Sequence, residues 1–155
     1  MAPRRPTRSR VDVVRAIPDD LEGMARIDAG ILGSSGRRAL LEEAIRGGAC
    51  AVARLEGAVV GFALFDRSFF GEAYLPLLIV AADHRRQGVG TALVRHVESL
   101  IPGRKLFTST NRSNLAMQRF CRSLGFVRSG IVDNLDEGDP EIIYFRKARP
   151  RRERG

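Results

Sequence analysis

Two spacings of apolar residues alternate along the chain, and each predicts one kind of element. Short runs rich in Val, Leu and Ile predict strands over residues 11–16, 50–55, 59–66, 73–80, 106–109, 127–132 and 142–146. Apolar residues three or four positions apart predict helices over residues 18–28, 37–46, 89–101 and 114–124. The order β-α-α-β-β-β-α-β-α-β-β is typical of an α/β domain with a mixed sheet.

The strand predicted over residues 73–80 contains a proline. Pro76 cannot donate a hydrogen bond to a neighbouring strand, because its nitrogen carries no hydrogen. We therefore expect either a bulge or a place where this strand parts from its neighbour.

Positive charge is concentrated at the two ends of the chain. The 155 residues carry a net charge of +8, of which residues 1–10 hold four arginines and no acid, and residues 146–155 hold six basic residues and one glutamate. The residues between them contain 16 basic and 17 acidic side chains, which is close to neutral. We expect disordered basic tails at residues 1–10 and 147–155 and one folded domain over residues 11–146. Solvated tails are favoured over nucleic-acid-binding arms, so no nucleic-acid partner is expected, although a module that binds through these tails stays an alternative.

The cysteines and the hydropathy pattern argue against several protein classes. Cys50 and Cys121 are far apart and lack the spacing of metal ligands, so we expect buried thiols, with no disulfide framework and no metal site. No apolar run approaches the roughly 18 residues that cross a bilayer, and the N-terminus lacks the apolar region of a secretion signal. We expect a cytoplasmic protein without a membrane partner.

The most informative segment, LIVAADHRRQGVGTAL at residues 78–93, predicts a strand, a short basic loop and the start of a helix. Glycines 88 and 90 allow a ligand to approach the backbone, and the free N–H groups at a helix start attract phosphate. The loop lacks the Walker lysine and the third glycine of the dinucleotide fingerprint. By themselves the two glycines also fit a purely structural role, in which they let the helix pack against its strand.

Two segments together resemble a known family. The sequence RRQGVG at residues 85–90 resembles the Gln/Arg-x-x-Gly-x-Gly/Ala signature of the GNAT superfamily of N-acyltransferases. The sequence NRSNLAMQRFCRSLGF at residues 111–126 is similar to a second conserved region of that superfamily, and the element order agrees from about residue 11 to residue 146. The resemblance implies a single-domain α/β fold whose mixed, mostly antiparallel sheet has a splayed central strand pair, which gives Pro76 a role.

The resemblance also implies a binding site for acetyl-CoA as the cosubstrate. Backbone amides from Gln87 to Thr91 would bind the pyrophosphate, and the strand residues Leu78 and Val80 would pair with the pantetheine arm. Asn114 matches a side chain that contacts the cofactor, and capping of its helix is an equally acceptable reading. The complete set of cofactor-binding residues that the resemblance implies is Leu78, Val80, Arg85, Arg86, Gln87, Gly88, Val89, Gly90, Thr91 and Asn114.

The catalytic residues are less clearly indicated. Cys121 stands where many family members have a tyrosine that protonates the leaving thiolate; its thiol can donate a proton, and burial as a small apolar residue is the alternative. The helix containing it is expected to turn Ala116 and Cys121 toward the core. Glu72 and Tyr74 share a strand face with Leu78 and Val80 if alternation persists. The resemblance implies a glutamate on this strand that activates the amine through water, and Tyr74 lies where some relatives place it. Glu72 is the preferred base, and a solvated acid at a strand end is its alternative.

The expected activity is transfer of acetyl from acetyl-CoA to a primary amine by direct attack in a ternary complex. The acceptor is a small molecule or a peptide, and a homodimer is plausible from the resemblance. Acidic residues between positions 133 and 141 either recognise a cationic amine or form a solvated hairpin. A CoA-sensing domain without catalytic activity is the alternative that the missing tyrosine leaves open.

Overall fold

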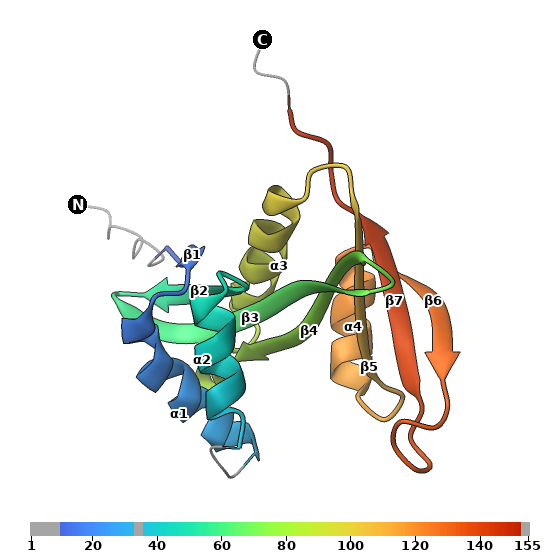
Figure 1. Ribbon diagram of the computed structural model, residues 1–155, viewed down its shortest axis with the longest axis horizontal. Coiled ribbons are helices and arrows are strands. Elements are labelled where there is room, and N and C mark those ends of the chain that lie inside the picture. The colour runs from blue at the N-terminus through green and yellow to red at the C-terminus, as the bar shows by residue number, and fades with distance from the viewer. Residues whose placement is uncertain (1–9, 33–35, 153–155) are drawn as a thin grey trace, which may run out of the picture. The chain divides into compact units, whose positions relative to one another are not determined.

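The computed structural model describes residues 10–32 and 36–152. Every predicted strand and helix is present (Figure 1). Two short 3-10 helices are added, η1 at Pro18–Asp20 and η2 at Ala82–His84. The strands are β1 Asp12–Arg15, β2 Cys50–Leu55, β3 Ala58–Phe69, β4 Glu72–Val80, β5 Lys105–Asn111, β6 Val127–Val132 and β7 Glu141–Lys147, and the helices are α1 Leu21–Leu32, α2 Arg38–Arg46, α3 Val89–Leu100 and α4 Leu115–Ser123.

The strands form a seven-stranded sheet in the order β1-β2-β3-β4-β5-β7-β6. The pairs β1–β2, β5–β7 and β6–β7 are antiparallel and β4–β5 is parallel, so the expected mixed, mostly antiparallel sheet is confirmed. The chain divides into two compact units, Met1–Phe62 with Ile79–Leu93, and Ala63–Leu78 with Val94–Gly155. The expected tail at residues 1–10 lies almost wholly outside the described residues, as do residues 153–155 of the other tail.

In the first unit, α1 and α2 lie on one face of the β1–β2 pair (Figure 1). Met24, Leu41, Val52 and Phe62 are fully buried, and this burial of apolar surface stabilises the unit. Between β2 and β3 the chain turns through two residues, Glu56 and Gly57, both of which have positive φ. That conformation is typical of the tightest hairpin turns.

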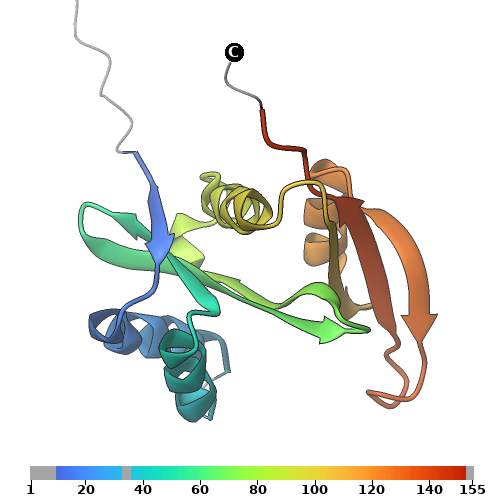
Figure 2. The ribbon, with the colours of Figure 1, turned by 45° about the horizontal axis from the view of Figure 1, so that its top comes forward.

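The second unit contains α4 on one face of the sheet formed by β5, β7 and β6 (Figure 2). Alternate residues of β5, among them Leu106 and Thr108, are buried, while Phe107 and Ser109 on the opposite face are half-buried. Phe107 pairs directly with Tyr74 on β4 and with Phe145 on β7. A row of aromatic rings therefore crosses this part of the sheet.

The parallel pairing of β4 with β5 is short. It joins Ala73 to Leu106, Tyr74 to Phe107 and Leu75 to Thr108, and β4 then continues through Pro76 to Leu78 without a partner on β5. The Oγ1 hydroxyl of Thr108 donates a hydrogen bond of 2.9 Å to the carbonyl oxygen of Leu75. Because this hydroxyl satisfies that carbonyl and Pro76 has no N–H, the strands separate at small cost in unpaired backbone groups. The expected splayed strand pair is thus confirmed, and Pro76 stands at its start.

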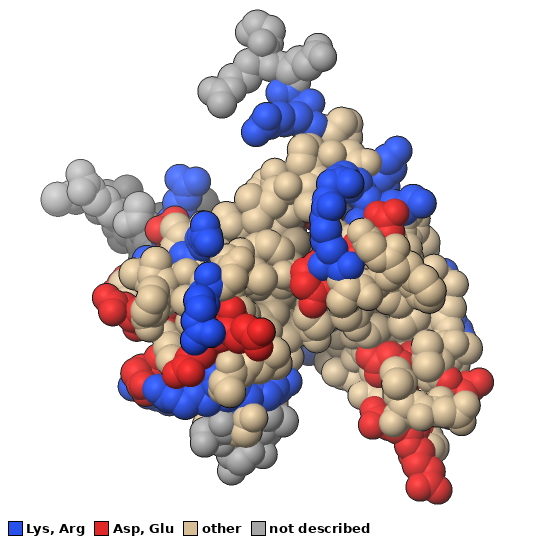
Figure 3. Space-filling view, viewed as in Figure 1, with Lys and Arg blue, Asp and Glu red and all other residues tan. Residues whose placement is uncertain are grey.

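Acidic side chains gather at the end of the β6–β7 loop (Figure 3). Two of them fix the loop to the end of β5: Asp136 accepts a hydrogen bond of 2.7 Å from Asn111 Nδ2, and Asp139 accepts bonds from the backbone and hydroxyl of Ser113 at 3.0 and 2.5 Å. These bonds from Ser113 lower the pKa of Asp139. Part of the acidity therefore has a structural role.

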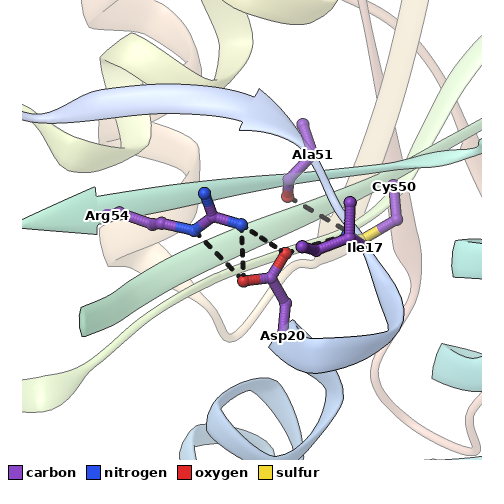
Figure 4. A network of polar contacts seen from close by, with 5 residues as sticks. All are labelled: Ile17, Asp20, Cys50, Ala51 and Arg54. Carbon is purple, nitrogen blue, oxygen red and sulfur yellow. Dashed lines mark hydrogen bonds and ion pairs between the residues drawn. The ribbon is translucent and has the colours of Figure 1, made fainter. Parts of the chain in front are cut away.

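A buried ion pair joins η1 to β2 in the first unit (Figure 4). Arg54 donates to both carboxylate oxygens of Asp20 at 2.8 to 3.1 Å, and the backbone N–H of Ile17 donates a further bond of 2.8 Å to the same carboxylate. Asp20 is only 5% exposed. Such a bidentate pair with an additional donor fixes the chain between β1 and α1.

One face of α4 differs from the sequence prediction. Ala116 was expected to face the core and is exposed, whereas Gln118 is buried. The side-chain amide of Gln118 donates hydrogen bonds to the carbonyl oxygens of Arg112 and Asn111 at 2.5 and 3.4 Å. A polar side chain can be buried here because carbonyl groups of the turn before the helix accept hydrogen bonds from its amide.

Candidate functional site

The loop between β4 and α3 bends sharply before the helix begins. After η2, the backbone of Arg86 and of Gly88 adopts positive φ, 60° and 82°. A Cβ atom added at Gly88 would meet no heavy atom within 4 Å, so the space above this residue is open. The two left-handed residues turn the loop so that α3 starts at Val89.

The backbone N–H groups of this loop form a continuous row of free donors. Among the described residues, no backbone acceptor is hydrogen-bonded to the N–H groups from Gly88 to Thr91, and the first bond into the helix is donated by Ala92 to Gly88. Four consecutive donors thus lie at the start of α3, where the helix dipole also favours negative charge. This arrangement suits a pyrophosphate.

Side chains around the loop leave these donors accessible. The amide of Gln87 folds back to donate a bond of 3.4 Å to the carbonyl oxygen of Asp83, and Asp83 pairs with His84 at 3.0 Å. Arg85 and Arg86 are exposed and have no acidic partner among the residues the structure describes. The positive charge of both arginines is therefore available to an anion.

Close backbone packing holds the start of α3 in place. A Cβ atom on Gly61 of β3 would lie 2.9 Å from the carbonyl oxygen of Ile79 and 3.0 Å from Cγ1 of Val89. Only glycine fits there without a shift of neighbouring atoms. The position of the donor row therefore depends on a glycine outside the loop, which the sequence prediction did not single out.

The remaining cofactor-binding candidates fall in different parts of the fold. Leu78 and Val80 are half-buried residues of β4, and Leu78 belongs to the segment without a partner on β5. Asn114 is the N-cap of α4, where its Oδ1 accepts a hydrogen bond of 3.1 Å from the backbone of Met117. The capping reading of Asn114 is thus confirmed, and its contact with a cofactor stays a prediction.

The side chain of Tyr74 reaches from β4 to β5. Its phenol oxygen lies 2.6 Å from Oγ of Ser109, and its ring stacks on Phe69 with a centroid separation of 5.6 Å. Glu72, two residues earlier on the same strand, is half-buried. Ser109 was not among the predicted residues. It lies two residues after Phe107 on the same face of β5, and only the β4–β5 register brings it close to Tyr74.

Cys121 is almost completely buried, with 1% of its surface exposed, and Cys50 is buried to the same degree. Burial raises the pKa of the Cys121 thiol to about 11 and that of the Cys50 thiol to about 12. Both thiols are free, as expected. At neutral pH the side chain of Cys121 is a protonated, apolar-like group in the core.

Neither a metal nor a membrane segment is indicated in the part of the chain that the structure describes. Residues 10–32 and 36–152 contain no group of three or more His, Cys, Asp or Glu side chains placed to hold a metal ion. Within the same residues, no helix has the length and apolarity required to cross a membrane.

Known proteins of the same type match most of the chain. The model of the acetyltransferase (GNAT) family matches residues 24–126. The crystal structure of a GNAT-family acetyltransferase from Bacillus cereus is 37% identical with a TM-score of 0.84, over 92% of this chain and 99% of that chain. Ard1 from Thermoplasma volcanium is 25% identical with a TM-score of 0.78, over 89% and 97% of the two chains.

A more distant structure shares the fold alone. The ribosomal-protein-S18-alanine N-acetyltransferase from Escherichia coli is 22% identical with a TM-score of 0.77, over 93% of this chain and 97% of that chain. No curated protein sequence matches the chain. The family model and the Bacillus cereus structure, together with the splayed strands and the free amides at the start of α3, establish that this chain belongs to the GNAT acetyltransferase family.

Proposed function

We propose that the chain is an N-acetyltransferase that uses acetyl-CoA as its cosubstrate and a primary amine as its acceptor. The observation that carries this proposal is the row of unpaired backbone N–H groups from Gly88 to Thr91 at the start of α3. In a protein of this family, such a row fits the pyrophosphate of CoA, with Arg85 and Arg86 adding positive charge. The backbone of Leu78, which has no partner on β5, and that of Val80 would hold the pantetheine arm.

The acetyl group arrives as a thioester, which the neutral amine attacks directly in a ternary complex without a covalent acyl-enzyme. Backbone N–H groups of β4 beyond Pro76 are the proposed donors to the developing oxyanion, because the strand has no β5 partner there. Use of acetyl-CoA is consistent with a cytoplasmic protein, which we retain as part of the proposal. A homodimer stays a prediction.

The amine must lose a proton before it attacks. An amine of pKa about 10.4 is neutral in roughly one part in a thousand or less at pH 7, so a nearby base increases the rate. Glu72 is the proposed base, acting through water, and Tyr74 is the alternative. Cys121 is the less suitable proton donor, because burial raises its pKa to about 11 and removes it from solvent.

The first test is calorimetric titration of the folded protein with acetyl-CoA, with NAD and ATP as comparisons. We expect selective binding in the micromolar range, and we expect Gly88→Glu to abolish it, because the new carboxylate fills the open space beside the amides. Gly57→Glu is the matched control: Gly57 also has positive φ, 81°, and open space around it, but it lies in the β2–β3 turn. Absence of acetyl-CoA binding by the wild type would refute the proposal.

The acceptor is tested with a panel of polyamines, aminoglycosides, amino acids and peptides with free N-termini. A peptide starting with alanine belongs in the panel, because the Escherichia coli protein of similar fold is named for acetylation of an alanine. We expect transfer to at least one class and a loss of about 100-fold or more in kcat for Glu72→Gln. Tight CoA binding without transfer to any amine would favour the CoA-sensing alternative.

A further inference from the structure

The basic C-terminal segment is attached to the fold at the end of α3. The backbone N–H of Ala148 donates to the carbonyl oxygen of Arg104 at 2.8 Å, and that of Gly103 donates to the carbonyl oxygen of Arg149 at 3.2 Å. Ala148 is 1% exposed. In Figures 1 and 2 the segment runs beside the loop between α3 and β5. The arginines that follow Ala148 therefore start from a fixed point rather than from a free tail.

This attachment forms a shallow hollow in the second unit. The hollow has a volume of about 430 Å³ and is lined by Arg95 and Ser99 of α3, by Glu98, by Arg149 and Arg151, and by two prolines. The three arginines are exposed, whereas Glu98 is buried. Residues separated by more than 50 positions in the sequence thus contribute to one basic surface.

The charge of this hollow is not balanced by neighbouring acids. The carboxylate of Glu98 is already paired with Arg146, whose Nε lies 2.9 Å from Glu98 Oε1. Residues 142–152 contain five basic residues and no acid. No ion pair or hydrogen bond engages the guanidinium groups of Arg95, Arg149 and Arg151 within residues 10–32 and 36–152. Three arginines beside a carboxylate that is already paired with Arg146 create a positive potential that an anion would relieve.

We propose that this hollow binds the phosphodiester backbone of a double-stranded nucleic acid, a function separate from acetyl transfer. Arginine forks bind phosphate oxygens in pairs, and the hollow is larger than one phosphate group needs. Its lining has no aromatic side chain on which an unpaired base could stack, which favours contacts to a duplex backbone over single strands. A bilayer surface is flat, and proteins usually attach to it through apolar side chains. This concave surface has no large apolar side chain and is therefore poorly suited to a bilayer.

The test measures binding of a labelled RNA duplex of about 16 base pairs by fluorescence anisotropy over a salt series. If the three arginines each neutralise one phosphate, their contribution to the slope of log K against log salt is about −2.7, or about 40-fold in affinity between 50 and 200 mM salt. We expect the triple variant R95Q/R149Q/R151Q to lose most of this slope. A DNA duplex should behave alike, since the contacts are to phosphates.

The matched control is the triple variant R67Q/R119Q/R128Q. It removes the same charge from three exposed arginines of the same unit that do not line the hollow, so it should keep the slope and most of the affinity. Circular dichroism and thermal unfolding establish that both triple variants are folded. An equal loss in both would mean that net charge alone binds the duplex, and this would overturn the proposal.

Three further binding experiments distinguish the proposed contact from other contacts that would be equally sensitive to charge. Binding that disappears on removal of residues 1–9 but persists in R95Q/R149Q/R151Q would assign the contact to the N-terminal arginines and overturn the proposal. Displacement of the duplex by acetyl-CoA would assign the arginines to the cofactor, with the same consequence. Binding to vesicles rich in phosphatidylserine with no binding to the duplex would also overturn it. Binding to the duplex that survives both deletion and acetyl-CoA would support it.

Discussion

The phenol oxygen of Tyr74 lies 2.6 Å from Oγ of Ser109, next to the place where β4 and β5 separate at Pro76. The two side chains belong to strands that pair through only three residues before separating. Their hydrogen bond fixes the Tyr74 hydroxyl on the strand whose later residues we propose for the acetyl thioester. Ser109 is therefore a positioning residue that acts through Tyr74.

This relationship predicts coupled effects on catalysis. Tyr74→Phe and Ser109→Ala should each lower kcat by roughly five- to tenfold, since each removes a hydrogen bond of about 1 kcal/mol, with little change in acetyl-CoA affinity. The double variant should be no slower than the slower single variant, because both changes break one bond. Steady-state kinetics with a double-mutant cycle measures this. Ser68→Ala, which removes a hydroxyl bonded only to Asp66 nearby, is the control. Additive losses would argue against the positioning role.

Gly61 allows β3 to approach the start of α3, and an added methyl group should disturb both stability and cofactor binding. Gly61→Ala places Cβ 2.9 Å from the Ile79 carbonyl oxygen and should cost about 1–3 kcal/mol of unfolding free energy. The dissociation constant for acetyl-CoA should rise by about tenfold, because the donor row shifts with α3. Urea unfolding and calorimetry measure the two effects. Gly30→Ala in α1, where a Cβ meets nothing within 4 Å, should be neutral or slightly stabilising.

The carboxylate of Asp20 balances Arg54 in a largely buried position. Asp20→Asn should lower the free energy of unfolding by about 3 kcal/mol, because it leaves the guanidinium with a neutral partner. Asp19→Asn removes the same charge from an exposed neighbour in η1 and should change stability by less than about 0.5 kcal/mol. Chemical denaturation compares the two variants. Equal free energies of unfolding for the two variants would show that the Asp20–Arg54 ion pair contributes little in this fold.

The two buried thiols predict a loss of stability at alkaline pH. Folding raises the pKa of Cys121 and Cys50 from 9.0 to about 11 and about 12. Below pH 9 both thiols are protonated in the folded and the unfolded chain, so their contribution is fully present. Between about pH 9 and 11 the unfolded chain releases these protons first, so each thiol lowers stability by up to about 1.4 kcal/mol per pH unit.

Denaturant titrations at pH 8 and pH 10 check this expectation. The wild type should lose more stability between these values than the double variant C50A/C121A, because tyrosine and lysine titrations are common to both proteins. An identical pH dependence would mean that the thiols are already accessible to solvent. Reaction with iodoacetamide at pH 8 should likewise be slow in the folded protein and fast after unfolding.

The sequence determined most of the local structure. The periods of apolar residues located every strand and helix, because burial of one face requires side chains at fixed spacing. The segment RRQGVG located the loop that we propose for the phosphates, since glycines and a helix start are local properties of the chain. Pro76 marked the start of the strand separation because a missing N–H has its effect at the residue itself.

Only the tertiary structure decided which distant residues meet. The β4–β5 register placed Ser109 beside Tyr74. Hydrogen bonds from Gln118 to carbonyl groups before α4 made Gln118 a buried residue in place of Ala116. Attachment of the C-terminal segment to the α3–β5 loop gathered Arg149 and Arg151 with Arg95, although the sequence indicated a solvated tail. Strand register and chain crossings depend on long-range packing, and local periodicity carries no information about them.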